Sequence, residues 1–127
     1  MVSKIGDTRT MAEKLNVVYV YGTLRTGRRD ELVEIKGAMY DLGSFPGVKL
    51  YDGCNTVVKC ERRVVDDEKL AVFDRYEGYR EDDPEHSLYI RRPILDGYIY
   101  EYNHDVKPER LIEDGDWFNH IAVEEVA

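Results

Sequence analysis

Runs of apolar residues and alternating apolar and polar positions divide this chain into short predicted strands and helices. The segment from Val17 to Tyr21 is apolar throughout and rich in β-branched and aromatic side chains. Such a run is typical of a strand buried on both faces, so we expect a central strand here, ended by Gly22. Further β-rich segments predict strands over residues 38–45 (broken at Gly43), 56–65 (with one face in water), 88–95 and 98–102.

Two segments carry the start and stop signals of helices. Asp66 or Asp67 can cap a helix that runs to about residue 77, and Gly78 is a typical stop. A second, short helix is expected over residues 30–36, capped by Asp30.

Turn residues separate the remaining segments. Pro46-Gly47 predicts a turn, and Asp96-Gly97 predicts a tight hairpin turn between two strands. Pro93 places the first of these strands near a sheet edge or a bulge. The segment 103–127 is expected to be irregular, with Trp117 and Phe118 packed back on the body of the protein.

The pattern as a whole predicts one α+β domain. The length of 127 residues suits a single domain. Regular patterning starts near Met11, so residues 1–13 are expected to be a flexible leader and residues 14–127 the domain. Because strands outnumber the short helices, we expect a mixed sheet that curls into a small barrel.

Composition and charge exclude several classes of protein. A net charge of −8 argues against binding to nucleic acid or to an anionic membrane. No apolar run is long enough for a membrane helix and the start lacks an apolar signal segment, so we expect a cytoplasmic protein. The two cysteines form no CxxC motif and the three histidines have no metal-ligand spacing. The sequence predicts neither a metal site nor an oligomeric state.

Glu77 is the first candidate for chemistry, because it continues the apolar stripe of the longer helix. Leu70, Phe73 and Glu77 stand at i, i+3 and i+7, on one helix face. Burial and the negative end of the helix dipole would both raise the pKa of this carboxyl group, as a general base at physiological pH requires. Alternatively, the last helical turn frays and Glu77 points into water.

Two further sites carry candidate binding residues. The strand at 17–21 ends in Tyr21-Gly22-Thr23-Leu24, whose backbone N–H groups could hold a carboxylate or an oxyanion, unless this is an ordinary turn. Tyr89 and Arg91 are two positions apart on a predicted strand and therefore share a face. That face either binds a polar ligand or is simply exposed to water.

The order of these motifs resembles the γ-glutamyl cyclotransferase-like superfamily, and within it the AIG2-like and γ-glutamylamine cyclotransferase branch. The resemblance spans about residues 16 to 120 and rests on five segments in this order: Tyr21-Gly22-Thr23-Leu24-Arg25, Phe45-Pro46-Gly47, the helix end from Leu70 to Gly78, Tyr89-x-Arg91, and Gly115-Asp116-Trp117.

The resemblance implies a small mixed barrel with its pocket at one mouth and a small-molecule γ-glutamyl substrate. The α-amine of that substrate would attack its γ-carbonyl and release 5-oxoproline and a free amine, without metal or cofactor. Glu77 would be the catalytic acid and base, and the N–H groups of residues 22–24 would hold the α-carboxylate or the oxyanion. Tyr21 and Tyr89 would line the pocket, and Arg25 and Arg91 would either help bind a carboxylate or only rim the site.

The sequence leaves two pairs of alternatives, one for the function and one for the leaving amine. The first is whether the same scaffold serves instead as a non-catalytic binding or regulatory protein, because a fold does not establish an activity. The second concerns the acidic segment 81–85. If it borders the pocket it would favour a cationic leaving amine, and otherwise it is a solubilising loop.

Overall fold

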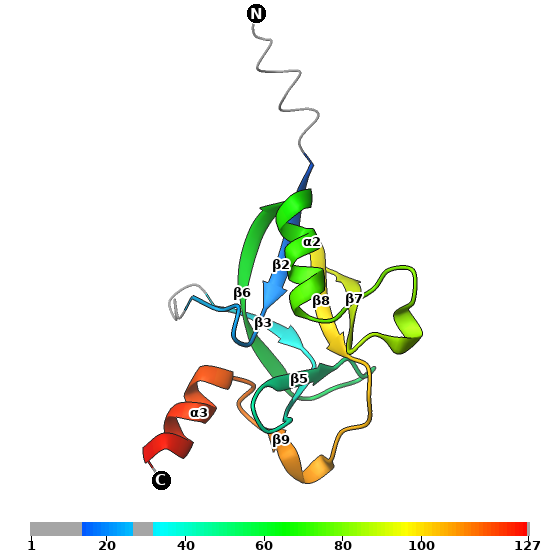
Figure 1. Ribbon diagram of the computed structural model, residues 1–127. Coiled ribbons are helices and arrows are strands. Elements are labelled where there is room, and N and C mark those ends of the chain that lie inside the picture. The colour runs from blue at the N-terminus through cyan, green and yellow to red at the C-terminus, as the bar shows by residue number, and fades with distance from the viewer. Residues whose placement is uncertain (1–13, 27–31, 127) are drawn as a thin grey trace, which may run out of the picture.

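The structure is a computed structural model that describes residues 14–26 and 32–126 (Figure 1). The expected leader at 1–13 and the expected helix cap at Asp30 lie outside the described residues. No helix in the described ranges is long and apolar enough to cross a membrane.

Five strands form the larger of two sheets, in the order β3, β6, β2, β8, β7. β2 runs parallel to β8 and the other neighbouring pairs are antiparallel, so the predicted mixed sheet is confirmed. β2 is the central strand, as its apolar run predicts, and Val18, Tyr19 and Val20 are at most 3% exposed. The strand bounds are β2 Leu15–Val20, β3 Leu32–Lys36, β6 Val57–Asp66, β7 Tyr89–Ile94 and β8 Gly97–Tyr102.

Three short strands form the second sheet, in the order β5 (Pro46–Lys49), β4 (Ala38–Asp41), β9 (Leu111–Ile112). The predicted strand over residues 38–45 is therefore too long, and the predicted turn at Pro46-Gly47 is wrong. The chain reverses earlier, where Gly43 has a φ of 112° and donates its N–H to Asp41 Oδ1 at 2.7 Å. Pro46 is tolerated as the first residue of β5 because its missing N–H is least needed there.

The two sheets share a core without closing into the expected barrel. Tyr19 and Ile35 from the larger sheet pack in one buried cluster with Met39 and Val48 from the smaller one. Within the described residues, the edge strands β3 and β7 pair with no strand of the smaller sheet. The α+β class is confirmed, but the hydrophobic pattern specifies the faces of strands and not which edges meet.

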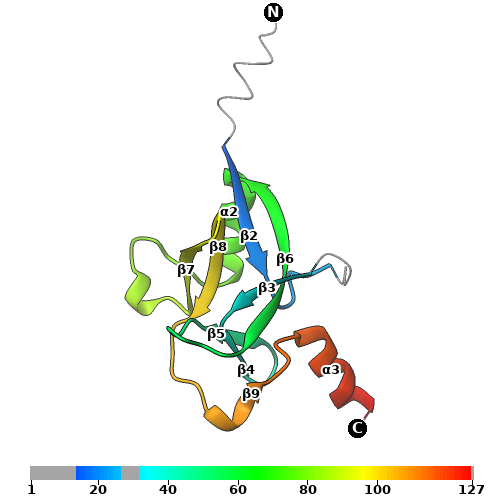
Figure 2. The ribbon, with the colours of Figure 1, turned by 180° about the vertical axis from the view of Figure 1, so that it is seen from behind.

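Helix α2 (Asp67–Tyr76) forms as its sequence signals predict. The side chain of Asp66 caps it by accepting the N–H of Lys69 at 2.8 Å, and Gly78 ends it with a φ of 68°. Leu70 and Phe73 are buried and pack on Val18, Val20 and Val65. Figures 1 and 2, which view the molecule from opposite sides, show α2 covering one face of the larger sheet near β2 and β8.

The helix predicted over residues 30–36 is wrong, because residues 32–36 form strand β3. β3 pairs with β6 over its whole length, from Leu32 opposite Glu61 to Lys36 opposite Val57. Val33 and Ile35 are β-branched, and pairing with a long neighbouring strand outweighs the weak helix-capping signal.

The predicted hairpin of β7 and β8 is confirmed, with Pro93 on the edge strand. Its loop is Leu95-Asp96, and Gly97 is already paired with Ile94. Gly97 has no room for a side chain, because a Cβ atom there would lie 2.2 Å from the carbonyl oxygen of Val17.

The segment after residue 103 is more regular than predicted. It contains the 3₁₀ turn η3 (Pro108–Arg110), strand β9 and helix α3 (Trp117–Val126), and another 3₁₀ turn, η2 (Pro84–His86), precedes β7. Trp117 is buried in the shared core and Phe118 packs against it, as predicted. Both views show α3 beside the smaller sheet and away from α2 (Figures 1 and 2).

Candidate active site

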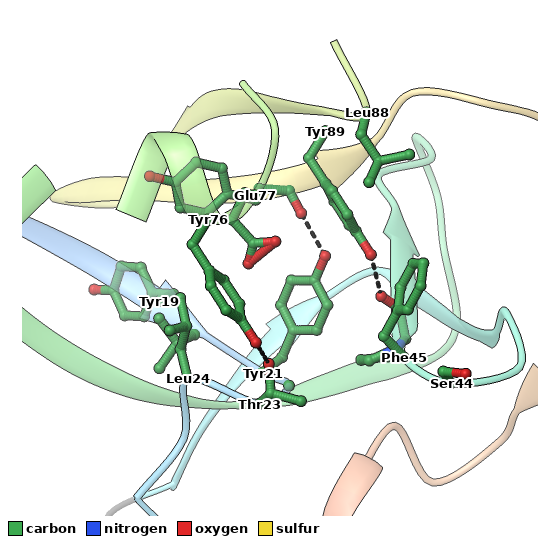
Figure 3. A pocket seen from close by; sticks show the side chains of 14 residues that line it. Tyr19, Tyr21, Thr23, Leu24, Ser44, Phe45, Tyr76, Glu77, Leu88 and Tyr89 are labelled. Carbon is green, nitrogen blue, oxygen red and sulfur yellow. Dashed lines mark hydrogen bonds between the residues drawn. The ribbon is translucent and has the colours of Figure 1, made fainter. Parts of the chain in front are cut away.

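A cavity of about 250 Å³ lies where the two sheets and the end of α2 meet. Five segments form its walls: the end of β2 with the loop after it, the turn between β4 and β5, the C-terminal end of α2, the start of β7, and β8 (Figure 3). The lining residues are Tyr19, Val20, Tyr21, Gly22, Thr23, Leu24, Ser44, Phe45, Pro46, Tyr76, Glu77, Leu88, Tyr89 and Tyr100.

Glu77 lies at the C-cap of α2, and its carboxylate points into this cavity (Figure 3). The helix does not fray before it, because the backbone N–H of Glu77 still donates to the carbonyl of Phe73 at 2.9 Å. Burial raises the pKa of Glu77 from 4.5 to about 7. The side chain is therefore poised between its charged and neutral forms near neutral pH, and the reading in which it points into water is wrong.

The tyrosines around Glu77 direct their hydroxyl groups to other partners. Tyr21 donates to the carbonyl of Tyr100 at 2.5 Å, and Tyr89 donates to the carbonyl of Pro46 at 2.6 Å (Figure 3). The hydroxyl of Tyr100 donates to Asp74 Oδ1 at 2.6 Å. Among the described residues, none hydrogen-bonds to the Glu77 carboxylate, so this acceptor is available to a ligand in the cavity.

A fourth tyrosine, Tyr76, closes one side of the cavity. Its hydroxyl is 2.5 Å from Thr23 Oγ1, and this hydrogen bond joins the end of α2 to the loop after β2 (Figure 3). Tyr76 and Thr23 thus fix the distance between the segment that carries Glu77 and the segment that carries the candidate binding amides.

The loop Gly22–Leu24 lines the cavity on one side. The N–H of Arg25 donates to the carbonyl of Gly22 at 2.9 Å and closes a tight turn. None of the N–H groups of residues 22–24 donates to a described residue. A Cβ atom on Gly22 would lie 2.9 Å from Pro46 Cγ, so the loop can approach β5 this closely only with glycine at that position.

The structure places Arg25 outside the cavity. Its buried guanidinium pairs with Asp116 Oδ1 at 2.8 Å and with Glu61 Oε2 at 3.4 Å, and it lies 4.3 Å from the centre of the Phe118 ring. Asp116 also accepts the N–H of Asn119 in the first turn of α3. Arg25 therefore connects the loop after β2 to the start of α3.

Arg91 is also absent from the cavity wall. Its guanidinium binds Asp74 Oδ2 at 2.6 Å and lies over the rings of Tyr98 and Tyr79. Because Asp74 also accepts the hydroxyl proton of Tyr100, this cluster holds α2 against β7 and β8.

The sequence thus predicted the lining positions Tyr21–Leu24, Glu77 and Tyr89, which the structure brings together around one cavity. It missed Tyr76, Tyr100, Ser44 and Leu88, and gave no role to Phe45 or Pro46. Tyr76 could have been found as the neighbour of Glu77, whereas the others face the cavity only because distant strands meet there. No group of three or more metal-binding side chains occurs within residues 14–26 and 32–126.

Comparison of the sequence with known proteins finds one family and a similar bacterial protein. Residues 18–119 match the family described as "Gamma-glutamyl cyclotransferase, AIG2-like". A protein of Vibrio cholerae serotype O1, named "Putative gamma-glutamylcyclotransferase", is 32% identical over 122 residues, which cover 84% of this chain and 98% of that protein.

Two solved structures share the fold at low sequence identity. YkqA from Bacillus subtilis has a TM-score of 0.66 and 20% identity over 90% of this chain, which spans 44% of YkqA. An uncharacterised protein from Pyrococcus horikoshii has a TM-score of 0.60 and 19% identity, and the match covers 87% of this chain and 96% of that one.

Proposed function

Because this chain belongs to the AIG2-like γ-glutamyl cyclotransferase family, we propose that it cyclises a γ-glutamyl amide to 5-oxoproline and releases a free amine. Glu77 is the general acid and base of this reaction. The observation that carries the proposal is the half-buried Glu77 carboxylate, which has a raised pKa, no partner among the described side chains, and a position in the same cavity as the loop Gly22–Leu24.

The charges of a γ-glutamyl group match the two polar features of the cavity. The substrate's α-ammonium would pair with the Glu77 carboxylate, and its α-carboxylate would accept N–H groups from residues 22–24. Tyr21 and Tyr89 would hold the methylene groups between these ends. The chain would then be folded so that the α-nitrogen lies near the γ-carbonyl carbon.

The chemical steps require one proton acceptor that later becomes a donor. An ammonium cannot attack a carbonyl, so Glu77 first takes a proton from it. The free amine then forms a C–N bond to the γ-carbon and closes a five-membered ring, and the carbonyl oxygen becomes an oxyanion. When the C–N bond to the leaving group breaks, Glu77 returns its proton to the departing nitrogen. The ring nitrogen gives its second proton to the released amine, which leaves as an ammonium ion. The products are 5-oxoproline and the amine, without addition of water.

Positioning accounts for much of the expected rate enhancement. Nucleophile and carbonyl belong to one molecule, and well-oriented intramolecular reactions reach effective molarities on the order of 10⁵ M or more. The enzyme therefore mainly selects the folded substrate and exchanges the proton. A pKa of about 7 suits Glu77 to both halves of this exchange near neutral pH.

The alternative is a binding or regulatory protein on the same scaffold. That alternative expects a closed cavity or a Glu77 side chain turned to solvent, whereas the cavity here is lined by both Glu77 and the loop after β2. The geometry therefore favours the enzyme.

The test is release of 5-oxoproline from a panel of γ-glutamyl amides by the purified protein. Wild type should release it, and Glu77→Gln, which keeps the shape of the side chain without its proton exchange, should lower kcat by at least about a hundredfold. Unfolding curves and binding of 5-oxoproline serve as controls for the variant's fold and cavity. Full turnover by Glu77→Gln would refute the role of this residue, and binding without turnover by wild type would favour the alternative.

A further inference from the structure

Apart from Glu77, the described residues that line the cavity include no charged side chain that could pair with a charge on the leaving amine. Glu77 is the one described lining residue with a carboxylate or a basic group. In the proposed complex it is already paired with the α-ammonium of the substrate, and the amides of residues 22–24 are paired with the α-carboxylate. A charge on the leaving group would therefore find no counter-charge in this wall.

The side of the cavity opposite the Gly22–Leu24 loop consists of large apolar side chains and the uncharged Ser44. Phe45 and Leu88 line it and are each 38% exposed, which is high for large apolar side chains. Both lie next to Tyr89, whose ring centre is 6.5 Å from that of Phe45, and Glu77 lies between this apolar group and the loop (Figure 3). A substrate held by Glu77 and the loop would place its leaving group against Phe45 and Leu88.

The acidic segment 81–85 adds no charge to the cavity wall, because none of its residues lines the cavity. Three of its carboxylates have cationic or histidine partners instead. Glu81 lies 3.6 Å from Arg91, Asp82 lies 3.8 Å from Arg80, and Asp83 lies 2.9 Å from His86. The position of this segment therefore does not support a cationic leaving amine.

From these three observations we infer that the leaving amine carries an uncharged alkyl or aryl group, so the substrates are γ-glutamyl amides of apolar amines. This inference rests on the proposed function. An apolar group covers Phe45 and Leu88 from water, whereas an ammonium or carboxylate placed there loses hydration without gaining a partner. The glutamyl end provides recognition by charge, and the leaving group provides it by apolar contact.

Four synthetic probes test the inference on the wild-type protein. They are the γ-glutamyl amides of methylamine, butylamine, 1,4-diaminobutane and 4-aminobutyrate, of which the last three have similar length and end in a methyl group, an ammonium and a carboxylate. The kcat/KM for 5-oxoproline release should be at least about tenfold higher for the butyl probe than for each of the other three.

The outcomes separate the two proposals. Release from the four probes with equal kcat/KM, or with a preference for a charged probe, would overturn the inference and leave the proposed function standing. Release from none of them would overturn the proposed function and this inference with it.

Variants locate the preference in the structure. Phe45→Ser and Leu88→Ser should each lower the ratio of kcat/KM for the butyl probe to that for the methyl probe by about fivefold or more. Asp82→Asn, in the acidic segment, is the control and should keep the wild-type ratio. An unchanged ratio in Phe45→Ser, or a ratio that shifts in Asp82→Asn, would contradict the inference.

Discussion

At the residue scale, the charged form of Glu77, which the reaction needs first, makes the fold less stable than the neutral form does. Its folded-state pKa of about 7 lies above the 4.5 of an exposed glutamate. The folded protein therefore binds the proton more tightly than the unfolded chain does. The resulting stabilisation is complete below pH 4.5 and is lost as the pH rises through about 7.

Glu77→Gln should therefore stabilise the protein at high pH, since the neutral amide avoids burying a charge. We expect the difference in free energy of unfolding between variant and wild type to grow by about 2 kcal/mol in favour of the variant from pH 5 to pH 8. Urea unfolding at both pH values measures it. The matched control is Glu81→Gln at an exposed site, which should show no such growth, and a constant difference for Glu77→Gln would contradict the raised pKa.

At the element scale, side chains of the loop after β2 anchor it to α2, to β6 and to the start of α3. Thr23 contacts Tyr76 at the end of α2, and Arg25 binds Asp116 before α3 and Glu61 on β6. The Arg25 side chain does not line the cavity, so its effect on catalysis would act through the position of the N–H groups before it.

Arg25→Met should break this buried ion cluster, because it removes the guanidinium that binds both Glu61 and Asp116. Loss of one partner of a buried pair costs about 3 kcal/mol or more in stability. Because the loop then loses an anchor, KM should rise more than kcat falls. Arg92→Met, which removes the exposed pair between Arg92 and Glu101, is the control and should cost about 1 kcal/mol or less. Equal unfolding midpoints for the two variants would contradict this role of Arg25.

The elements that the sequence predicted correctly are those with strong local signals. The apolar run of β2, the caps of α2 at Asp66 and Gly78, and the β7–β8 hairpin all follow from neighbouring residues. β3 and α3 were missed because they depend on distant partners: β3 pairs with β6, and Trp117 at the start of α3 packs in the core. The same distinction applies to the site. Glu77 and the loop were predictable from local motifs, whereas Tyr100, Phe45 and Leu88 reach the cavity only through the tertiary fold.

At the scale of the whole molecule, the cavity lies at a junction of the two sheets. Pro46 on the smaller sheet contacts Gly22 after β2, and its carbonyl accepts the hydroxyl proton of Tyr89 on β7. These contacts determine how far apart the loop, the apolar group and Glu77 lie, so the packing of the sheets sets the shape of the site.

Gly22→Ala should disturb this junction, because the added methyl group would lie 2.9 Å from Pro46 Cγ. We expect a loss of stability of about 1–3 kcal/mol and a fall in kcat/KM of at least about tenfold as the loop moves away from β5. Gly37→Ala is the matched control, since its methyl group would have ordinary contacts of 3.4 Å. A wild-type kcat/KM in Gly22→Ala would contradict the role of this close contact in shaping the site.

The central claim is that the Glu77 carboxylate accepts the substrate proton, and the pH dependence of 5-oxoproline release from γ-glutamyl butylamide tests it most directly. For wild type, kcat/KM should fall about tenfold per pH unit below a pKa near 7, because the protonated Glu77 cannot accept a proton. Glu77→Gln should lack this inflection and show only residual turnover. A wild-type profile that is flat between pH 5 and pH 8, or one that Glu77→Gln retains, would contradict the account.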